Sequence, residues 1–393
     1  MKNMRCEDIY YDTYGRAPEA VVFCPYRISP LGAHIDHQYG KINGLAINKG
    51  IYIAYSRKEN GVVELKSLNF PKRAQFHVNS VPDKKAGDWA DHMRGAAKIL
   101  SEEYPLRYGV SAVIEGTLPI GGLSSSAAVI IAFLSALAKV NKIQLGDWEI
   151  IMMAKAAENK YVGVNCGKLD QSCEVLCRKD QLLYLDCADD SYELIPKNPA
   201  MKPFKIGVFF SGLERSLATS DYNLRQDECK AAAYSLLAYG GSHYGKFIDT
   251  RLRDVPKSVF EEYKDRLPEN FRKRAEHYFG EITRAEIGSE AWRRGDLESY
   301  GKLIFESGRS SIEKYECGCP ELITLYNIMT ETKGIYGGRF SGAGFKGCCM
   351  ALIDPDMADE VLWNVQNKYL KEYPALGGKY LGALCDSADG VKL

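Results

Sequence analysis

Residues 119–128 form a run of glycines and serines, Pro-Ile-Gly-Gly-Leu-Ser-Ser-Ser-Ala-Ala. The run joins a predicted strand, SAVIEGTLPI, to a predicted apolar helix, SSSAAVIIAFLSALAKV, which we expect one of its serines to cap. Glycines let backbone N–H groups face a ligand without a Cβ clash, and a helix start adds unpaired N–H groups and positive dipole. The pattern therefore predicts a phosphate site, although a capped helix after a tight turn is the plainer interpretation. No Gly-Lys-Ser/Thr follows, so this is not a Walker loop.

Other segments combine glycine with charged residues, and each has an ordinary explanation when taken alone. His34 and Asp36 could belong to a polar surface turn, and Asp170 could cap a helix. Taken together and in order, the segments resemble the GHMP kinase superfamily and, within it, the galactokinase branch. The matching segments are PYRISPLGAHIDHQYG (25–40), LPIGGLSSSAAV (118–129), GVNCGKLDQ (163–171) and GGRFSGAGFKGC (337–348), with weaker matches at DWADHMRG (88–95) and LATSDYNLR (217–225). The resemblance spans nearly the whole chain.

The resemblance implies an ATP-dependent phosphorylation of a sugar at its anomeric hydroxyl. Asp170 matches the family's catalytic carboxylate and would accept the proton of that hydroxyl as it attacks the γ-phosphorus. Arg27 would lie beside Asp170, keep it ionised and stabilise charge on the transferring group. Because an aspartate is a weak base, the rate would depend mainly on positioning and electrostatics.

The resemblance also assigns the cofactors, ATP and Mg²⁺. Glu158 precedes Asp170 by twelve residues, as the family's metal-binding carboxylate does, and would hold Mg²⁺ together with Ser126. Trp89 and His92 would pack on the adenine. The residues expected to surround the nucleotide's phosphates are Gly121, Gly122, Leu123, Ser124, Ser125 and Ser126, with Gly342 and Gly344 in a loop that closes over them. The run between Pro119 and Leu123 is one residue shorter than the family often has.

The sugar would contact residues of segments 25–40, 163–171 and 217–225, including His34, Asp36, Gly167 and Tyr222. Ala33 stands where galactokinases carry the glutamate that faces the C6 hydroxyl. A glutamate there would repel a C6 carboxylate by up to about 4 kcal/mol at about 4 Å and an effective dielectric of about 20. Lys168 and Lys346 are basic where galactokinases usually have uncharged residues, and either could pair with such a carboxylate or support phosphate.

In these departures the sequence resembles the galacturonokinases, so we expect D-galacturonate as the sugar. Galactose, or another galactose altered at C6, stays open as an alternative substrate. A protein that binds sugar and ATP only to signal stays open as a different class of function. A sugar-dependent consumption of ATP would separate that class from an enzyme.

Bulk composition limits the partners. Lysine plus arginine and aspartate plus glutamate number 51 each, which argues against nucleic acid or an anionic membrane as partner. The twelve cysteines lack the paired spacing of a zinc site, and the N-terminus is polar without an apolar signal core. We expect a cytoplasmic enzyme whose partners are small molecules, and the sequence does not predict its oligomeric state.

The elements that must position these residues form an α+β pattern over 393 residues, which is long enough for two domains. The proline-rich stretch 196–203 predicts a boundary between an N-terminal domain, 1–198, and a C-terminal domain, 199–393. Asn60-Gly61 predicts a hairpin turn. Helices are expected at about 218–240, 256–279, 281–306 and 320–331. By resemblance, the active site would lie in the cleft between two GHMP-kinase-like domains.

Overall fold

The computed structural model describes residues 5–213, 221–243 and 245–393 of the chain. The first half is built on a twisted sheet in which β1 and β12 pair with the long central strand β2. The strands of this sheet are β1 (Ala20–Ile28), β2 (Lys41–Lys58), β3 (Val62–Ser67), β4 (Ala74–His77), β5 (Gly109–Gly116), β6 (Gln181–Asp186), β7 (Tyr192–Pro196) and β12 (Ser387–Ala388). Their order along the main path is β4-β3-β5-β2-β6-β7.

β1 carries Arg27, which lies just after an irregularity in the pairing of β1 with β2. The antiparallel register runs to Pro25↔Gly50 and resumes at Tyr26↔Ile47. Proline has no backbone N–H to donate to a ladder, which makes it a natural place for a bulge. The extra residues, Asn48 and Lys49, lie on β2, so the pairing register changes two residues before Arg27.

The hairpin expected at Asn60-Gly61 does not form. The turn is present, with Gly61 at φ +69°, but β2 and β3 are not paired. β5 lies between them, antiparallel to β2 and parallel to β3. Gly109 begins β5 so close to Val62 that a Cβ on it would be 2.0 Å from the Val62 carbonyl oxygen. A local turn signal therefore predicted the turn and missed the long-range partner.

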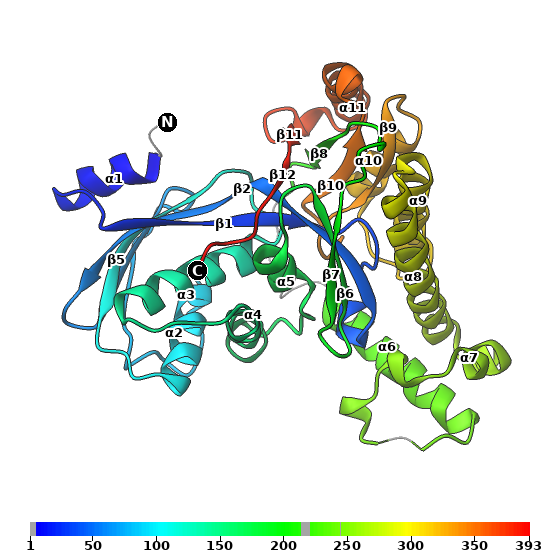
Figure 1. Ribbon diagram of the computed structural model, residues 1–393, viewed down its shortest axis with the longest axis horizontal. Helices are drawn as coiled ribbons and strands as arrows, with labels where there is room; N and C mark the ends of the chain where they lie inside the picture. The colour runs from blue at the N-terminus through cyan, green and yellow to red at the C-terminus, as the bar shows by residue number, and fades with distance from the viewer. Residues whose placement is uncertain (1–4, 214–220, 244) are drawn as a thin grey trace.

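Helices cover one face of this sheet, as Figure 1 shows for α2, α3 and α4. α3 follows the glycine–serine run and is apolar on nearly all sides, so it is buried as the central helix of the half. The helices of this half are α1 (Arg5–Tyr14), α2 (Asp91–Glu103), α3 (Ser125–Val140), α4 (Asp147–Ala156), a π-helical turn (Ala157–Val162) and α5 (Leu169–Leu176). α1 lies on the opposite face, where Cys6 and Tyr10 pack with Ala54 and Val113.

The second half has its own sheet, in the order β11-β8-β10-β9. Its strands are β8 (Lys205–Phe210), β9 (Ile335–Phe340), β10 (Cys348–Ile353) and β11 (Leu381–Cys385). Its helices are α6 (Tyr222–Tyr239), α7 (Lys257–Tyr263), α8 (Glu269–Arg294), α9 (Leu297–Glu313), α10 (Pro320–Thr330) and α11 (Ala358–Glu372).

The helix boundaries expected near residue 280 were wrong. α7 ends early, α8 starts after Pro268, and α8 continues through Gly280 to Arg294. Gly295, at φ +75°, ends it. A glycine inside a helix costs only about 1 kcal/mol, whereas a proline must begin or break one.

The two halves join over a wide contact. The chain passes from the first sheet to the second between Pro196 and Lys205. α8 of the second half packs on β2, and β12 then returns to the first sheet and pairs with β2 as well. Figure 1 shows this last segment crossing back over the first half. The division at residues 198 and 199 stays a prediction.

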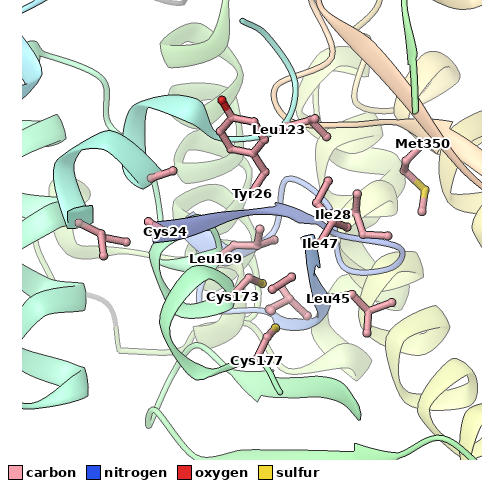
Figure 2. Close-up of a cluster of buried hydrophobic side chains, with 14 of the residues drawn as sticks. Cys24, Tyr26, Ile28, Leu45, Ile47, Leu123, Leu169, Cys173, Cys177 and Met350 are labelled. Carbon is pink, nitrogen blue, oxygen red and sulfur yellow. The ribbon is translucent and has the colours of Figure 1, made fainter. Parts of the chain in front are cut away.

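A core of small and apolar side chains lies beneath the end of β1. Figure 2 shows Ile28 of β1 beside Ile47 of β2, with Leu45 below them and Met350 of the second sheet at the edge of the cluster, while Tyr26 points up from β1, away from Leu45. Cys173 and Cys177 of α5 belong to the same cluster. All twelve cysteines are free thiols.

Candidate active site

Arg27 at the end of β1 and Asp170 at the start of α5 form an ion pair. Arg27 Nε and Nη2 lie 2.7 and 2.6 Å from Asp170 Oδ1. Burial opposes the charge on Arg27, yet Asp170 and Glu174 hold the pKa of Arg27 above its ordinary value. The side chain of Asp170 is 28 % exposed, so its carboxylate can meet a ligand.

Ser124 engages the other oxygen of Asp170. Its hydroxyl donates to Asp170 Oδ2 at 2.9 Å. Ser124 occupies the N-cap position of α3 in a left-handed conformation, φ +62°, and makes no side-chain cap bond. The expected serine cap is therefore wrong, because that hydroxyl serves the carboxylate. The first N–H groups of α3 keep their capacity to bind an anion.

A cavity of about 850 Å³ opens above this pair. Most of the residues predicted from the sequence line it. They are Arg27, Ala33, His34, Asp36, Trp89, His92, Gly121, Gly122, Ser124, Ser125, Ser126, Glu158, Asp170, Tyr222, Gly342 and Lys346. Of the weaker segment 217–225, residues 217–220 lie outside the described residues.

The two glycine loops meet backbone to backbone at the cavity's wall. A Cβ on Gly342 would be 3.0 Å from Gly122 Cα, and one on Gly347 would be 2.7 Å from the Gly121 carbonyl carbon. Gly121 and Gly122 also have positive φ angles, +130° and +85°. Only glycine allows both this approach and this conformation. The contact brings residues 121–126 of the first half beside residues 342–347 of the second.

A tight turn after β1 presents Ala33, His34 and Asp36 to the cavity. Gly32 has φ +82°, and a Cβ there would be 2.5 Å from the Lys41 carbonyl oxygen. Asp36 Oδ2 accepts a hydrogen bond from Leu169 N at 3.2 Å, which ties the turn to α5. Burial and the charge of Asp170 raise the pKa of Asp36. Burial lowers the pKa of His34, so it is neutral near pH 7.

Glu158 is a second buried carboxylate on the cavity wall. It lies in the π-helical turn, a feature frequent at functional sites. Gln171 Nε2 donates to Glu158 Oε2 at 2.5 Å. Burial and the negative charge of Asp170 raise the pKa of Glu158 to about 7, against hydrogen bonds from Ser126, Cys166 and Gln171.

Aromatic rings line another part of the cavity. Trp89 and Phe70 stack with ring centroids 5.7 Å apart and planes 4° apart. Phe70 was missed from the sequence, since a single aromatic residue before a proline carries no motif. His92 lies next to them on α2, and burial lowers its pKa.

The remaining predicted residues do not line the cavity. Leu123 is buried, and its carbonyl accepts from Arg27 N at 3.4 Å. Gly167 packs directly against the side chain of Asp36, since a Cβ on Gly167 would lie 2.1 Å from Asp36 Oδ2. Gly344 packs in the same way against the side chain of Cys317. Lys168 pairs with Asp190 and is turned from the cavity, so the expectation that it meets a sugar carboxylate does not match its placement.

The chain matches three family descriptions. "GHMP kinases N terminal domain" covers residues 91–178, "GHMP kinases C terminal" covers 289–371, and "Galactokinase galactose-binding signature" covers 9–57. A galacturonokinase of Arabidopsis thaliana is 39 % identical over 95 % of this chain and 93 % of its own length. The chain belongs to the GHMP kinases, in their galactokinase branch.

Other GHMP kinases support this placement. A galactokinase of Roseiflexus sp. is 30 % identical over 96 % of this chain and 94 % of its own length. The Lactococcus lactis galactokinase solved with galactose superposes with a TM-score of 0.88 at 26 % identity, covering 98 % of each chain. The α+β GHMP fold predicted from the sequence is confirmed. Within the described ranges, no helix has the length and apolarity that a membrane span requires.

Proposed function

We propose that this chain transfers the γ-phosphoryl group of ATP to the anomeric hydroxyl of D-galacturonate, giving galacturonate 1-phosphate. The observation that carries the proposal is Ala33, which lines the cavity beside His34 and Asp36. Galactokinase-like sequences have a glutamate at this position, facing C6, and alanine removes its charge and opens space for a carboxylate. The plant relative named galacturonokinase supports the same substrate.

Lys346 supplies a positive charge for this substrate. It lines the same cavity as Ala33, in the loop that follows β9. A lysine near a C6 carboxylate would gain roughly 4 kcal/mol of Coulomb attraction at about 4 Å and an effective dielectric of about 20, before desolvation is subtracted. Neutral galactose gains nothing from that charge. We propose Lys346, and not Lys168, as the cationic partner.

The reaction assigns a role to the ion pair. The anomeric O–H bond breaks as the new O–P bond forms; the proton goes to Asp170 and ADP leaves with the former bridging oxygen. Arg27 compensates the negative charge that develops on the transferring group. Ser124 and Arg27 each hold one oxygen of Asp170, so the carboxylate is oriented before the sugar binds.

The nucleotide would lie along the first glycine loop and the start of α3, with its adenine against Trp89 and Phe70. Glu158 and Ser126 fit a magnesium ion. Both are oxygen donors on the cavity wall, and a raised carboxylate pKa marks a site that lacks positive charge. Mg²⁺ bound there would neutralise phosphate charge. Free thiols throughout the chain suit a reducing compartment, and we propose the cytoplasm.

Galactose is the second candidate substrate. The match to the galactose-binding signature over residues 9–57 favours it. His34 and Asp36 would serve the ring hydroxyls of either sugar, so the choice rests on C6. A signalling protein without activity is disfavoured by the intact Arg27–Asp170 pair.

The test is ADP release with Mg-ATP across a panel of hexoses and hexuronates. We expect galacturonate to give the highest kcat/KM. A preference for galactose would reject the uronate and keep the kinase. Binding of sugar and ATP with no ADP release from any sugar would reject the enzyme and leave the sensor.

A further inference from the structure

The turn that carries Ala33 and His34 has two residues in a left-handed backbone conformation, and one of them, His34, carries a Cβ. Gly32 and His34 both have left-handed φ angles, +82° and +63°. For a residue with a Cβ this region is costly and persists only when surrounding contacts impose it. Residues 32–35 lie between β1 and a short 3-10 turn (Asp36–Gln38), so no ladder or helix fixes them.

Helix α8 of the second half supplies the missing contacts. Gly32 N donates to Glu281 Oε2 at 2.9 Å, and His277 Nε2 lies 3.0 Å from the Ala33 carbonyl oxygen. Because a carbonyl only accepts, His277 Nε2 carries the hydrogen, and Nδ1 accepts from Ser310 Oγ at 2.8 Å. Two side chains on one face of α8 thus form hydrogen bonds with the amide of Gly32 and the carbonyl of Ala33.

We propose that His277 and Glu281 are positioning residues for the sugar, which hold the peptide groups around Ala33 so that residues 33, 34 and 36 face the substrate. Neither side chain lines the cavity, and both are buried. The inference rests on the proposed function, since it needs a sugar bound at this turn.

The clamp, meaning the hydrogen bonds of Glu281 and His277 to Gly32 and Ala33, depends on the ionisation states of these two side chains near neutral pH. Burial raises the pKa of Glu281, but the positive charges of Arg284 and Arg339 and a hydrogen bond from Ser307 hold it below its ordinary value. Burial lowers the pKa of His277 to about 4. Glu281 is therefore a fixed acceptor, and His277 is a neutral donor with one defined tautomer.

The packing of α8 agrees with this role. Gly288 lies on the same face as His277 and Glu281, and a Cβ there would be 2.2 Å from Leu31 Cδ1. Glu281 Oε2 also accepts from Ser307 Oγ at 2.9 Å and lies 4.0 Å from Arg339 Nη1. Arg339 Nε donates to the carbonyl of Phe340, a cavity residue that begins the second glycine loop. The contacts of Glu281 therefore extend through Arg339 to the second glycine loop, residues 342–347.

Two amide substitutions of similar size test the clamp. In His277→Gln the amide can reach the place of Nε2 and donate to Ala33, whereas in His277→Asn it reaches only the place of Nδ1. We expect His277→Asn to raise the sugar KM at least about fivefold, because a buried carbonyl loses its donor. We expect His277→Gln to stay within about threefold. The KM for ATP should change less than about twofold in both.

Ser289→Ala is the matched control, because it removes from the same helix a buried acceptor, Ser289 Oγ, to which Asn43 Nδ2 on β2 donates at 3.0 Å. It should lower the melting temperature without raising the sugar KM. Equal sugar KM values for the Asn and Gln variants, or a parallel rise in both KM values, would overturn the clamp. If His277→Asn does not fold, a sugar KM for His277→Gln more than tenfold above the parent's would overturn it as well. The parent's own sugar-dependent ADP release, measured first, decides the proposed function separately.

Discussion

The hydroxyl of Ser124 donates to Asp170 Oδ2 at 2.9 Å, while Arg27 occupies Oδ1 of the same carboxylate. The N-cap residue of α3, the helix proposed to bind phosphate, is thus bonded directly to the proposed base. Under the proposed function this relationship would couple the nucleotide and the sugar through one side chain, because Ser124 and Asp170 both line the cavity.

Asp170→Asn should lower kcat by about 10²–10⁴, because the amide cannot take the sugar's proton. Binding of ATP, measured by calorimetry, should stay within a few fold, since the phosphate loop is intact. Ser124→Ala should have a smaller effect on kcat. A variant Asp170→Asn with kcat within tenfold of the parent would show that another group accepts the proton.

Ala33→Glu should move the preference from galacturonate toward galactose. The new carboxylate would repel the C6 carboxylate and offer an acceptor to the C6 hydroxyl. We expect the ratio of kcat/KM values, galacturonate over galactose, to fall at least about tenfold. An unchanged ratio would mean that C6 does not lie near residue 33.

Lys346→Met should raise the KM for galacturonate by about tenfold or more, and leave the KM for galactose nearly unaltered. Lys168→Met is the matched control, since its ammonium pairs with Asp190 outside the cavity. Steady-state kinetics with both sugars compares the four values. Equal losses for both sugars would assign Lys346 to phosphate instead.

Glu158→Gln should stabilise the nucleotide-free protein at pH 8 more than at pH 5. The pKa of Glu158 is raised to about 7 from an ordinary 4.5, so the folded protein holds a proton that the unfolded chain has lost between those values. Stability therefore falls as pH rises through this window, and glutamine removes that loss. Calorimetric melting at both pH values should show a difference of a few degrees that grows with pH. A difference independent of pH would contradict the raised pKa.

The same substitution should cost activity. Without the carboxylate, Mg-ATP turnover should fall while the protein melts higher, as expected for a site that keeps a destabilising charge for function. A Glu158→Gln protein with full turnover would remove Glu158 from the metal site.

Local patterns predicted the cavity well where the chemistry lies in one segment. The serines at 124–126 came from such a local pattern, whereas the Arg27–Asp170 pair, 143 residues apart in the chain, came from the family resemblance, and the structure brings them together. The strand partner of β2 was missed, because a turn such as Asn60-Gly61 specifies only the chain's reversal and not which strand fills the gap.

Contacts made across the two halves could not be read from spacing. His277 and Glu281 are four residues apart on an ordinary polar helix, and their partners lie 244 and 249 residues earlier. Lys168 sits inside a matching motif, yet its side chain turns to Asp190. Motif membership fixes where the backbone passes, while neighbours from elsewhere decide where a long side chain points.

Competition between the two sugars tests the central claim most directly. Galacturonate and galactose are mixed at equal concentration with limiting Mg-ATP, and the products are resolved by phosphorus NMR. We predict that phosphate appears on the anomeric oxygen and mainly on galacturonate. Galactose 1-phosphate as the main product, or phosphate at another oxygen, would contradict the account.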